Sequence, residues 1–294
     1  MIIISVCIPT KDRFELLVDT IQSIISDGVP VSKYEIVVAD NSDGYQVEEY
    51  CVLLAEKGYN IRHVRNPVLG FYNSIIALKS GSGQLLKLHN DYSCFIPGMF
   101  SKMVDVVERN LVDKSTLFFS NNTLGLSSDR YCNDLNEFIG CTNFQNTWSS
   151  AFSIWKADLE RVPNAKEQLN YMFPHTSLLF NCNTKYLVLT GYYFDNKSVP
   201  GKGGYNLFHC FCVNYLGMLR NEVAKKCVTK STYLKVKWLL YVKFIIPWYY
   251  KTVYTSQGYT YIVDDADSII KETYGRVALL AMRFACRLKN ITMR

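Results

Sequence analysis

The chain has 294 residues, of which 49% are apolar and 20% charged, and this composition excludes a disordered chain, a collagen and a coiled coil. Its ten cysteines show no zinc-like pairing, and we interpret them as free thiols in a reducing compartment. The chain has 32 Lys and Arg and 26 Asp and Glu in total. Residues 219–294 hold 14 of the basic and 5 of the acidic residues, so a basic tail follows a nearly neutral body. Such a tail favours an anionic partner.

Strand and helix patterns alternate along the first third of the chain. Apolar runs predict buried strands at 2–8 and 34–39, and further strands are expected at 60–65 and 84–88. The segments between them predict helices, at 13–26, 46–57 and 70–80. Repeated strand–helix–strand units predict an α/β fold with a mostly parallel central sheet and helices on both faces.

The later part of the chain is less regular. We expect strands at 117–120, 151–155 and 186–194, and helices over 164–182 (interrupted near Pro174), 206–226 and 264–290. The apolar run at the N-terminus is too short for a signal peptide core, so we expect no leader. The longest later apolar stretch falls short of the roughly 20 residues that cross a bilayer, so we expect no membrane span.

Polar side chains follow each predicted strand. Thr10 and Arg13 follow the first, the run Asp40-Asn41-Ser42-Asp43 the second, and His89-Asn90-Asp91 the fourth. Ligands of parallel sheets bind outside the carboxyl ends of the strands, so these residues should rim one crevice. Carboxylates there suit a divalent metal and a nucleotide ribose. The alternative is that both runs are ordinary polar turns and helix caps.

Several stretches resemble family 2 glycosyltransferases with the GT-A fold. They are IISVCIPTKDR at 3–13, EIVVADNSDG at 35–44 and LLKLHNDY at 85–92. The run KLHND and the segment 203–219 are similar to bacterial enzymes that build O-antigen and capsule polysaccharides. The resemblance implies a GT-A, Rossmann-like catalytic domain over 1–220, with a nucleotide-sugar part at 1–100 and an acceptor part at 101–220. A basic, aromatic, helical extension would follow at 221–294.

The resemblance also implies a donor site. The nucleotide-binding residues would be Pro9, Thr10, Arg13, Asp40, Asn41, Ser42, Asp43, Asn73, His89 and Asn90. Asp91 matches the last carboxylate of the family's metal motif and would act in catalysis with Mn²⁺ or Mg²⁺. His89 stands where the family usually has the first Asp, and it would ligate the metal or hydrogen-bond the ribose.

Inverting transfer, which the resemblance implies, needs a base to take the proton of the acceptor hydroxyl. The family supplies a carboxylate in the region that corresponds here to residues 168–181, which contains none. His175 is the strong titratable group in that region, and we predict it as the base. A hydrogen-bonded histidine at a helix end is the alternative for His175. Four carboxylates remain substitutes for the base: Asp134, Glu137, Asp158 and Glu167.

In the C-terminal region, lysines alternate with aromatic residues, at Lys235, Lys237, Trp238, Tyr241, Lys243, Trp248, Tyr249, Tyr250 and Lys251. This pattern predicts a helix on the inner face of the bacterial cytoplasmic membrane, since aromatic rings favour the interface and lysines favour anionic head groups. The alternative is a basic helix packed on the catalytic body. We find no nucleic-acid motif and expect no nucleic-acid partner.

The sequence thus predicts a peripheral membrane enzyme that transfers a sugar from a nucleotide sugar, UDP-linked, to a surface glycan on a polyprenyl diphosphate. The alternative is a non-catalytic nucleotide- or glycan-binding protein on a degenerate glycosyltransferase fold. A Rossmann dehydrogenase, a methyltransferase and a nucleotidyltransferase are disfavoured, because PTKDR, and no Gly-rich turn, follows the first strand.

Overall fold

The computed structural model describes residues 1–67, 70–182, 185–255 and 257–292, and the chain forms two compact units. Unit 1 comprises Met1–Phe138 and Gln145–Ser198, and unit 2 comprises Ile139–Phe144 and Val199–Arg294. The change of charge that suggests a boundary after residue 220 therefore lies inside unit 2. The boundary after residue 220 differs from the one between Ser198 and Val199 because charged residues lie mostly on the surface, whereas the packing of the chain defines the two units.

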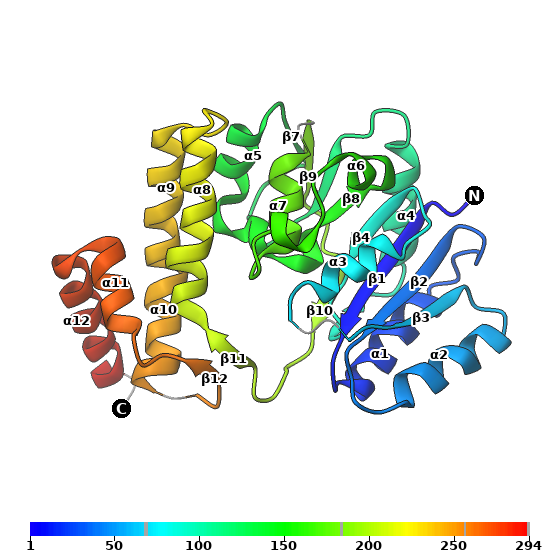
Figure 1. Ribbon diagram of the computed structural model, residues 1–294, viewed down its shortest axis with the longest axis horizontal. Helices are drawn as coiled ribbons and strands as arrows, with labels where there is room; N and C mark the ends of the chain where they lie inside the picture. The colour runs from blue at the N-terminus through cyan, green and yellow to red at the C-terminus, as the bar shows by residue number, and fades with distance from the viewer. Residues whose placement is uncertain (68–69, 183–184, 256, 293–294) are drawn as a thin grey trace. The chain divides into compact units, whose positions relative to one another are not determined.

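Unit 1 is built on a five-stranded sheet in the order β3-β2-β1-β4-β8 (Figure 1). The first four strands are parallel, and the fifth runs antiparallel to β4. The strands are β1 (Ile4–Thr10), β2 (Tyr34–Asp40), β3 (Ile61–Arg65), β4 (Leu85–Leu88) and β8 (Ser153–Trp155). All four parallel strands were predicted, and the mostly parallel α/β fold is confirmed.

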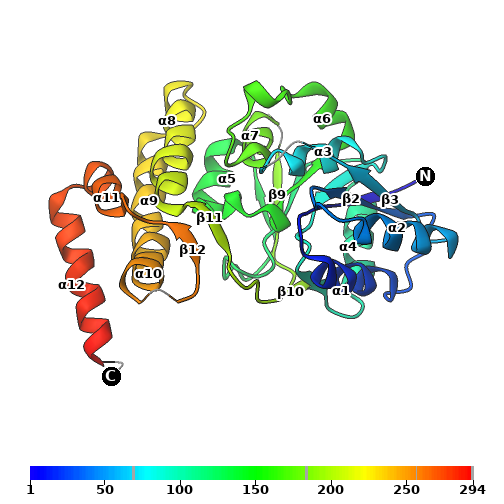
Figure 2. The ribbon, with the colours of Figure 1, turned by 60° about the horizontal axis from the view of Figure 1, so that its bottom comes forward.

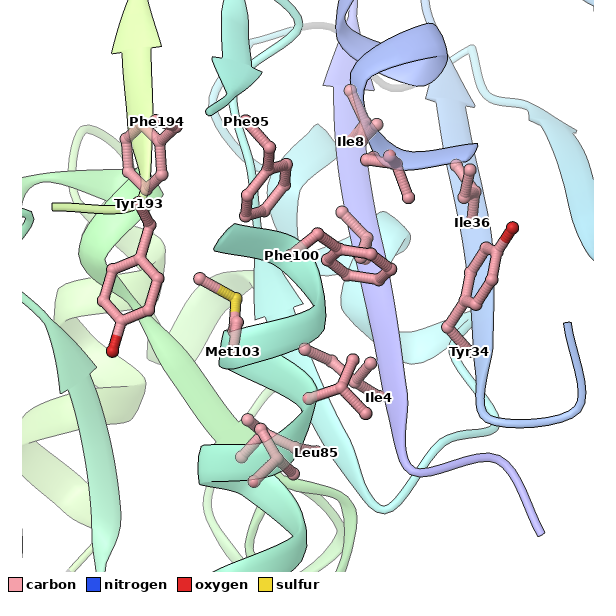
Figure 3. Close-up of a cluster of buried hydrophobic side chains, with 14 of the residues drawn as sticks. Ile4, Ile8, Tyr34, Ile36, Leu85, Phe95, Phe100, Met103, Tyr193 and Phe194 are labelled. Carbon is pink, nitrogen blue, oxygen red and sulfur yellow. The ribbon is translucent and has the colours of Figure 1, made fainter. Parts of the chain in front are cut away.

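Helices cover both faces of this sheet, which explains why β1, β2 and β4 are buried along nearly their whole length. On one face, Ile4 and Ile8 of β1 pack against Phe100 and Met103 of α4 (Figure 3). Helices α1 and α2 contribute to the same core. Helix α3 contacts β1, β2 and β4 from the other side. The bounds are α1 (Phe14–Ile25), α2 (Gln46–Glu56), α3 (Asn73–Lys79) and α4 (Met99–Arg109).

Two smaller sheets complete unit 1. In the three-stranded one, β6 (Thr116–Phe119) lies parallel to β9 (Tyr186–Leu189), and β7 (Arg130–Cys132) lies antiparallel to β9. The other is an antiparallel ribbon of β5 (Ser93–Phe95) and β10 (Phe194–Asn196). The strand predicted over 186–194 is thus two strands in different sheets. Two short helices accompany them, α6 (Lys156–Arg161) and α7 (Pro174–Asn181), while α5 (Leu135–Thr142) begins in unit 1 and ends in unit 2.

The helix predicted over 164–182 is shorter in the structure. A 3-10 turn covers Lys166–Gln168, and the α-helix α7 begins at Pro174. Proline suits the first turn of a helix because that position needs no amide donor. Pro174 therefore begins the helix that the sequence placed on both sides of it.

Unit 2 is mainly helical (Figure 1). Helical backbone is continuous from Lys230 to Tyr254, with π-helical turns at Tyr241–Ile245 and Tyr250–Tyr254. Such turns accommodate Pro247, which has no amide for the regular helical bond. A parallel pair of short strands lies beside the helices. The elements are α8 (Leu216–Ala224), α9 (Lys230–Leu240), α10 (Ile246–Tyr249), α11 (Ala266–Tyr274), α12 (Arg276–Thr292), β11 (Gly203–Asn206) and β12 (Thr260–Ile262).

Aromatic side chains expected at a membrane interface contribute to the core of unit 2. Tyr241, Tyr249 and Tyr250 are buried, and the Tyr241 hydroxyl donates to the carbonyl of Ala278 in α12 at 2.5 Å. Trp238 stays half exposed. In the described part of the chain, each helix is too short or too polar to cross a membrane.

Candidate active site

Residues that follow β1 and β4 meet at the carboxyl edge of the main sheet. The Thr10 hydroxyl donates to Oδ2 of Asp91 at 2.7 Å, and Nε of Arg13 lies 3.1 Å from the same oxygen. Thr10 pairs with Asp40 in the parallel register of β1 and β2, so Asp40 belongs to the same edge. The structure therefore places Thr10, Arg13, Asp40 and Asp91, which the strand-end rule selects, at one edge of the sheet.

Asp91 combines burial with a positively charged neighbour. Its side chain is 1% exposed, whereas Arg13 is about a third exposed. Burial raises the pKa of Asp91 to about 6, although Arg13 and the Thr10 hydroxyl act to lower it. A desolvated carboxylate at a sheet edge is electrostatically suited to a cation that arrives with an anionic ligand.

Asp40 is fully buried and is held from three directions. Its Oδ1 accepts the amide of Ser42 at 2.8 Å, while Oδ2 lies 3.1 Å from Nε2 of His63 and 3.7 Å from Arg65. His63 and Arg65 were not predicted as site residues. The alternation of side chains along a strand could have indicated them. His63 and Arg65 are two residues apart in β3, which pairs in register with β2, so both lie on the same face of the sheet as Asp40.

Asparagines secure the backbone around Asp40. The Asn41 amide donates to the carbonyl of Asn66, and the Asn66 amide donates to Oδ1 of Asn73 at 2.9 Å. The Asn73 amide in turn donates to the carbonyl of Ala39 at 2.8 Å. Asn73 thus supports the end of β2 from the first turn of α3, next to the nucleotide site that the resemblance implies.

The loops after β1 and β2 are joined to each other. The amide of Asp12 donates to the Ser42 hydroxyl at 2.9 Å, with Asp12 in the left-handed region at φ 52°. Arg65 donates to the carbonyls of Ser42 and Gly44. Of the other predicted nucleotide residues, Pro9 pairs with Ala39 inside the sheet and Asp43 is exposed at the tip of its loop.

A model of the glycosyl transferase family 2 matches residues 5–149, the stretch that contains β1, β2, β4 and Asp91. This part of the chain belongs to the family. No curated protein matches the chain.

Solved structures of low sequence identity share the fold of this glycosyltransferase. Staphylococcus aureus TarS is 12% identical with a TM-score of 0.58, over 97% of this chain and 54% of TarS. A TarS structure of residues 1–349 in complex with UDP-GlcNAc is 13% identical with a TM-score of 0.57, over 94% of this chain and 83% of that chain. The chain thus spans about half the length of full TarS.

An archaeal enzyme is similar to the same extent. The mannosyltransferase PcManGT from Pyrobaculum calidifontis, in complex with GDP-Man and Mn²⁺, is 13% identical with a TM-score of 0.54. The match covers 97% of this chain and 79% of that chain. At these identities the likeness establishes the fold of the glycosyltransferase, including the mostly parallel sheet.

The segment 89–91, where the resemblance implies a metal motif, is held in place by two serines and a lysine. The backbone amide of Asn90 donates to the Ser150 hydroxyl at 3.0 Å, and the Ser149 hydroxyl donates to the side-chain Oδ1 of Asn90 at 2.7 Å. Lys87, fully buried in β4, donates to the carbonyls of Leu88 and Ser150. These bonds fix the segment that carries Asp91 against the turn at 149–151.

Lys87 was not predicted as a site residue. Burial lowers its pKa to about 7, and its Nζ lies 5.5 Å from the centre of the Phe119 ring. Its signal in the sequence is a charged residue inside the apolar strand LLKL. A lysine in such a place is costly to desolvate, so it indicates an internal hydrogen-bonding task.

His89 contacts the core, whereas the sequence placed it at the metal or the ribose. Its ring stacks on Phe95 with centres 4.6 Å apart and meets Phe194 edge-on. Nε2 faces the carbonyl of Ser93 at 2.7 Å, and Nδ1 is buried with no hydrogen-bond partner among the described residues. Burial lowers the pKa of His89 to about 3, so the ring is neutral. Its contacts with the core differ from those of the metal ligand or ribose partner that the resemblance implied.

His175 has the contacts of the helix-terminal histidine that the sequence allowed as an alternative. It is buried in the first turn of α7, with Nε2 2.9 Å from the carbonyl of Thr147 and its ring against Phe152. Burial lowers the pKa of His175 to about 4. A neutral, hydrogen-bonded ring is fixed in place, and a role as catalytic base stays a prediction.

The substitute carboxylates lie in other settings. Asp134 and Glu137 accept amides at the start of α5, and Glu167 is exposed. Asp158 pairs with Arg161 at 2.7 Å in a pocket that also contains Trp155. Trp155 pairs with Leu85 at the first residue of β4, so this pocket lies at the sheet edge opposite Asp91.

The residues at the carboxyl edge fit a hard divalent cation. In the described ranges of the chain, no group of three or more His, Cys, Asp or Glu side chains comes together. Mg²⁺ and Mn²⁺ do not need one, because they are often bound by one or two carboxylates together with substrate phosphates and water. Asp91 supplies such a carboxylate, buried and beside the hydroxyl of Thr10.

Proposed function

We propose that this glycosyltransferase transfers a sugar, with inversion, from a UDP-sugar to a bacterial surface glycan on a polyprenyl diphosphate, of the O-antigen or capsule type. The observation that carries the donor assignment is the buried Asp91, held by Thr10 and Arg13 at the edge that also contains Asp40. The donors named for TarS and PcManGT, UDP-GlcNAc and GDP-Man, support a nucleotide sugar.

Each residue of the edge has a task in this proposal. Asp40, with Asn41 and Ser42, binds the nucleoside, and Arg13 faces the diphosphate with its positive charge. Asp91 holds Mn²⁺ or Mg²⁺, and the metal, when bound, offsets the charge that develops on the leaving nucleoside diphosphate. Asn90 and Lys87 keep Asp91 in position through Ser149 and Ser150.

The acceptor side rests on charge and on resemblance. Residues 219–294 carry 14 basic and 5 acidic side chains, which favours a location at the inner face of the cytoplasmic membrane. A lipid-linked acceptor would be available there, and the run KLHND resembles enzymes that use such acceptors. His175 is retained as the proposed base, and a His175→Gln variant with unchanged UDP affinity and lost turnover would support it.

Titration calorimetry tests the donor site. We expect UDP to bind more tightly than GDP or CDP, with binding that needs Mn²⁺ and is lost in Asp91→Asn. Asp105→Asn, at an exposed carboxylate of α4, is the matched control and should bind as the parent does. Absence of nucleotide binding under all conditions, or equal binding by Asp91→Asn, would overturn the proposal.

A non-catalytic binding protein is the second candidate. It is favoured by the single carboxylate of the metal motif and by the lack of a carboxylate in residues 168–181. Release of UDP from UDP-sugars in the presence of polyprenyl-diphosphate glycans separates the two. We expect turnover, whereas Mn²⁺-dependent UDP binding without release of sugar under any acceptor condition would favour the binding protein.

A further inference from the structure

Helix α12 has two apolar rows on opposite sides. Leu279, Met282 and Cys286 are buried against the rest of unit 2. A second row is exposed, with Val277 at 82%, Leu280 at 53%, Phe284 at 63% and Leu288 at 47%. At 3.6 residues per turn the two rows are about half a turn apart. One row packs the helix onto unit 2, so the other faces away from that contact.

An exposed row of this kind needs an explanation. Single exposed apolar side chains are common on soluble proteins. Four exposed apolar side chains spaced three or four residues apart along one helix form a continuous stripe, which is typical of an interaction surface. Figure 2 shows α12 in red at the edge of unit 2, where its outward side is not covered by another element of that unit.

The charge of α12 identifies the kind of partner. The helix carries Arg276, Arg283, Arg287 and Lys289, and it has no Asp or Glu. Arg283 forms an ion pair with Asp267 of α11. By helical geometry, Arg276 and Arg287 flank the exposed row on one side. A hydrophobic stripe bordered by arginines is complementary to a surface that is apolar inside and anionic outside.

A second copy of the chain fits this stripe less well. A symmetric pair of α12 helices would bring the same set of arginines face to face with no carboxylate on either helix, and like charges oppose each other in such an interface. An anionic bilayer offers phosphates for the arginines and acyl chains for Phe284 and Leu280.

We propose that the outward face of α12, defined by Val277, Leu280, Phe284 and Leu288 with Arg276 and Arg287, docks on an anionic phospholipid surface. The helix would lie in the plane of the interface. This assignment differs from the lysine- and aromatic-rich segment 235–251 that the sequence suggests, because Tyr241, Tyr249 and Tyr250 are buried in unit 2. It does not depend on which donor or acceptor the enzyme uses.

Vesicle co-sedimentation of the full chain tests the proposal. We expect binding to vesicles with equal parts of phosphatidylglycerol and phosphatidylcholine, weaker binding to phosphatidylcholine alone, and release by salt. Each basic side chain near an anionic surface contributes roughly a fivefold factor in affinity, so Arg287→Glu should weaken binding at least about tenfold. Phe284→Asp should weaken vesicle binding at least about tenfold, because it removes apolar contact with the bilayer and adds charge repulsion.

Matched controls separate docking from folding and from donor chemistry. Val112→Asp changes an apolar side chain that is 96% exposed in unit 1, and Lys57→Glu reverses an exposed charge of unit 1; both should bind vesicles as the parent does. Thermal unfolding of each variant checks the fold, and UDP affinity measured on the same samples should not change.

Equal vesicle binding by Phe284→Asp, Arg287→Glu and the parent would overturn the proposal, as would no binding to anionic vesicles. A dimer in sedimentation velocity that Phe284→Asp dissociates would overturn it in favour of a second copy. Loss of UDP binding with vesicle binding intact would count against the proposed function and leave the docking surface standing.

Discussion

Two buried carboxylates at opposite edges of the main sheet have different surroundings. Glu35, near the start of β2, is held at Oε1 by the hydroxyls of Ser5 at 2.5 Å and Ser82 at 2.8 Å and by the amide of Gly83 at 3.2 Å. Arg62 lies 3.4 Å from Oε2. Asp91, beyond the end of β4, receives the Thr10 hydroxyl and Arg13 at one oxygen, Oδ2.

The pKa values of the two carboxyls shift in opposite directions. Burial acts to raise the pKa of Glu35, but hydrogen bonds from Ser5 and Ser82, together with the charge of Arg62, lower it further than burial raises it. For Asp91, burial dominates and raises the pKa to about 6. Glu35 is therefore satisfied by its own chain, which is typical of a structural role. The charge of Asp91 is compensated only in part, which is typical of a ligand site.

Asp91→Asn is expected to have the largest effect. Removing the charged ligand should weaken Mn²⁺-dependent UDP binding at least about 100-fold. Even mutating a residue that only hydrogen-bonds to a metal ligand typically lowers metal affinity about 10–100-fold. Calorimetry with UDP and Mn²⁺ measures it. If Glu35→Gln loses as much affinity as Asp91→Asn, the contrast between the two edges is wrong.

The pH dependence of stability should separate the two carboxylates. Asp91 has a raised pKa in the folded state, so its contribution to stability is present below pH 3.8 and is lost as the pH rises through about 6. The shift in the pKa of Asp91 corresponds to about 3 kcal/mol in the free energy of unfolding. Glu35 has a lowered pKa, so its contribution is present at neutral pH and is lost as the pH falls through its folded value.

Urea unfolding between pH 4 and 7 measures this difference. We expect the decline in the free energy of unfolding between pH 4 and 6 to be reduced in Asp91→Asn and retained in Glu35→Gln. An unchanged pH profile in Asp91→Asn would show that burial does not control this carboxyl.

Glu35→Gln should act on stability and spare the donor site. Replacing the charged acceptor of several hydrogen bonds is expected to lower the free energy of unfolding by about 2 kcal/mol. UDP affinity of the folded protein should stay within twofold. Glu56→Gln, at an exposed carboxylate of α2, is the matched control and should leave both quantities unchanged.

Lys87→Met tests whether the buried lysine positions Asp91. Losing its bonds to Leu88 and Ser150 should weaken Mn²⁺-dependent UDP binding about tenfold, as for other residues that orient metal ligands. Stability should change little, because an apolar side chain of similar size avoids the cost of burying the charge. Lys79→Met, at an exposed lysine of α3, controls for loss of charge. A stability loss with unchanged affinity would make Lys87 purely structural.

His89→Phe should have the smallest effect on the donor site. Phenylalanine preserves the aromatic contacts with Phe95 and Phe194 and loses the bond to the Ser93 carbonyl, at about 1 kcal/mol of stability. Mn²⁺ and UDP affinities should stay within twofold. A loss comparable to that of Asp91→Asn would restore His89 as a metal ligand.

The sheet and its polar edge were predictable because both follow from local rules. Apolar runs identify β1 and β2, the alternation of strand and helix patterns adds β3 and β4, and the strand-end rule selects Thr10, Asp40 and Asp91 without tertiary information. The direction of a side chain near a strand end was not predictable in the same way. Lys87 pairs with Val6 and so faces the core of α4, and His89, two residues on, is enclosed by Phe95 and Phe194.

The C-terminal region shows the same limit. Alternating lysines and aromatic residues establish that a helix is amphipathic, but they do not show what covers its apolar side. In unit 2 the Tyr241, Tyr249 and Tyr250 side chains are covered by the unit itself, and the exposed apolar row is on α12. That row has no aromatic–lysine alternation and was not singled out from the sequence.

Counting bound Mn²⁺ by electron paramagnetic resonance, with and without UDP, tests the assignment of Asp91 most directly. We expect the parent, Glu35→Gln and His89→Phe to bind Mn²⁺ when UDP is present, and Asp91→Asn to leave the free-ion signal undiminished. Retention of UDP-dependent Mn²⁺ binding by Asp91→Asn would contradict the account.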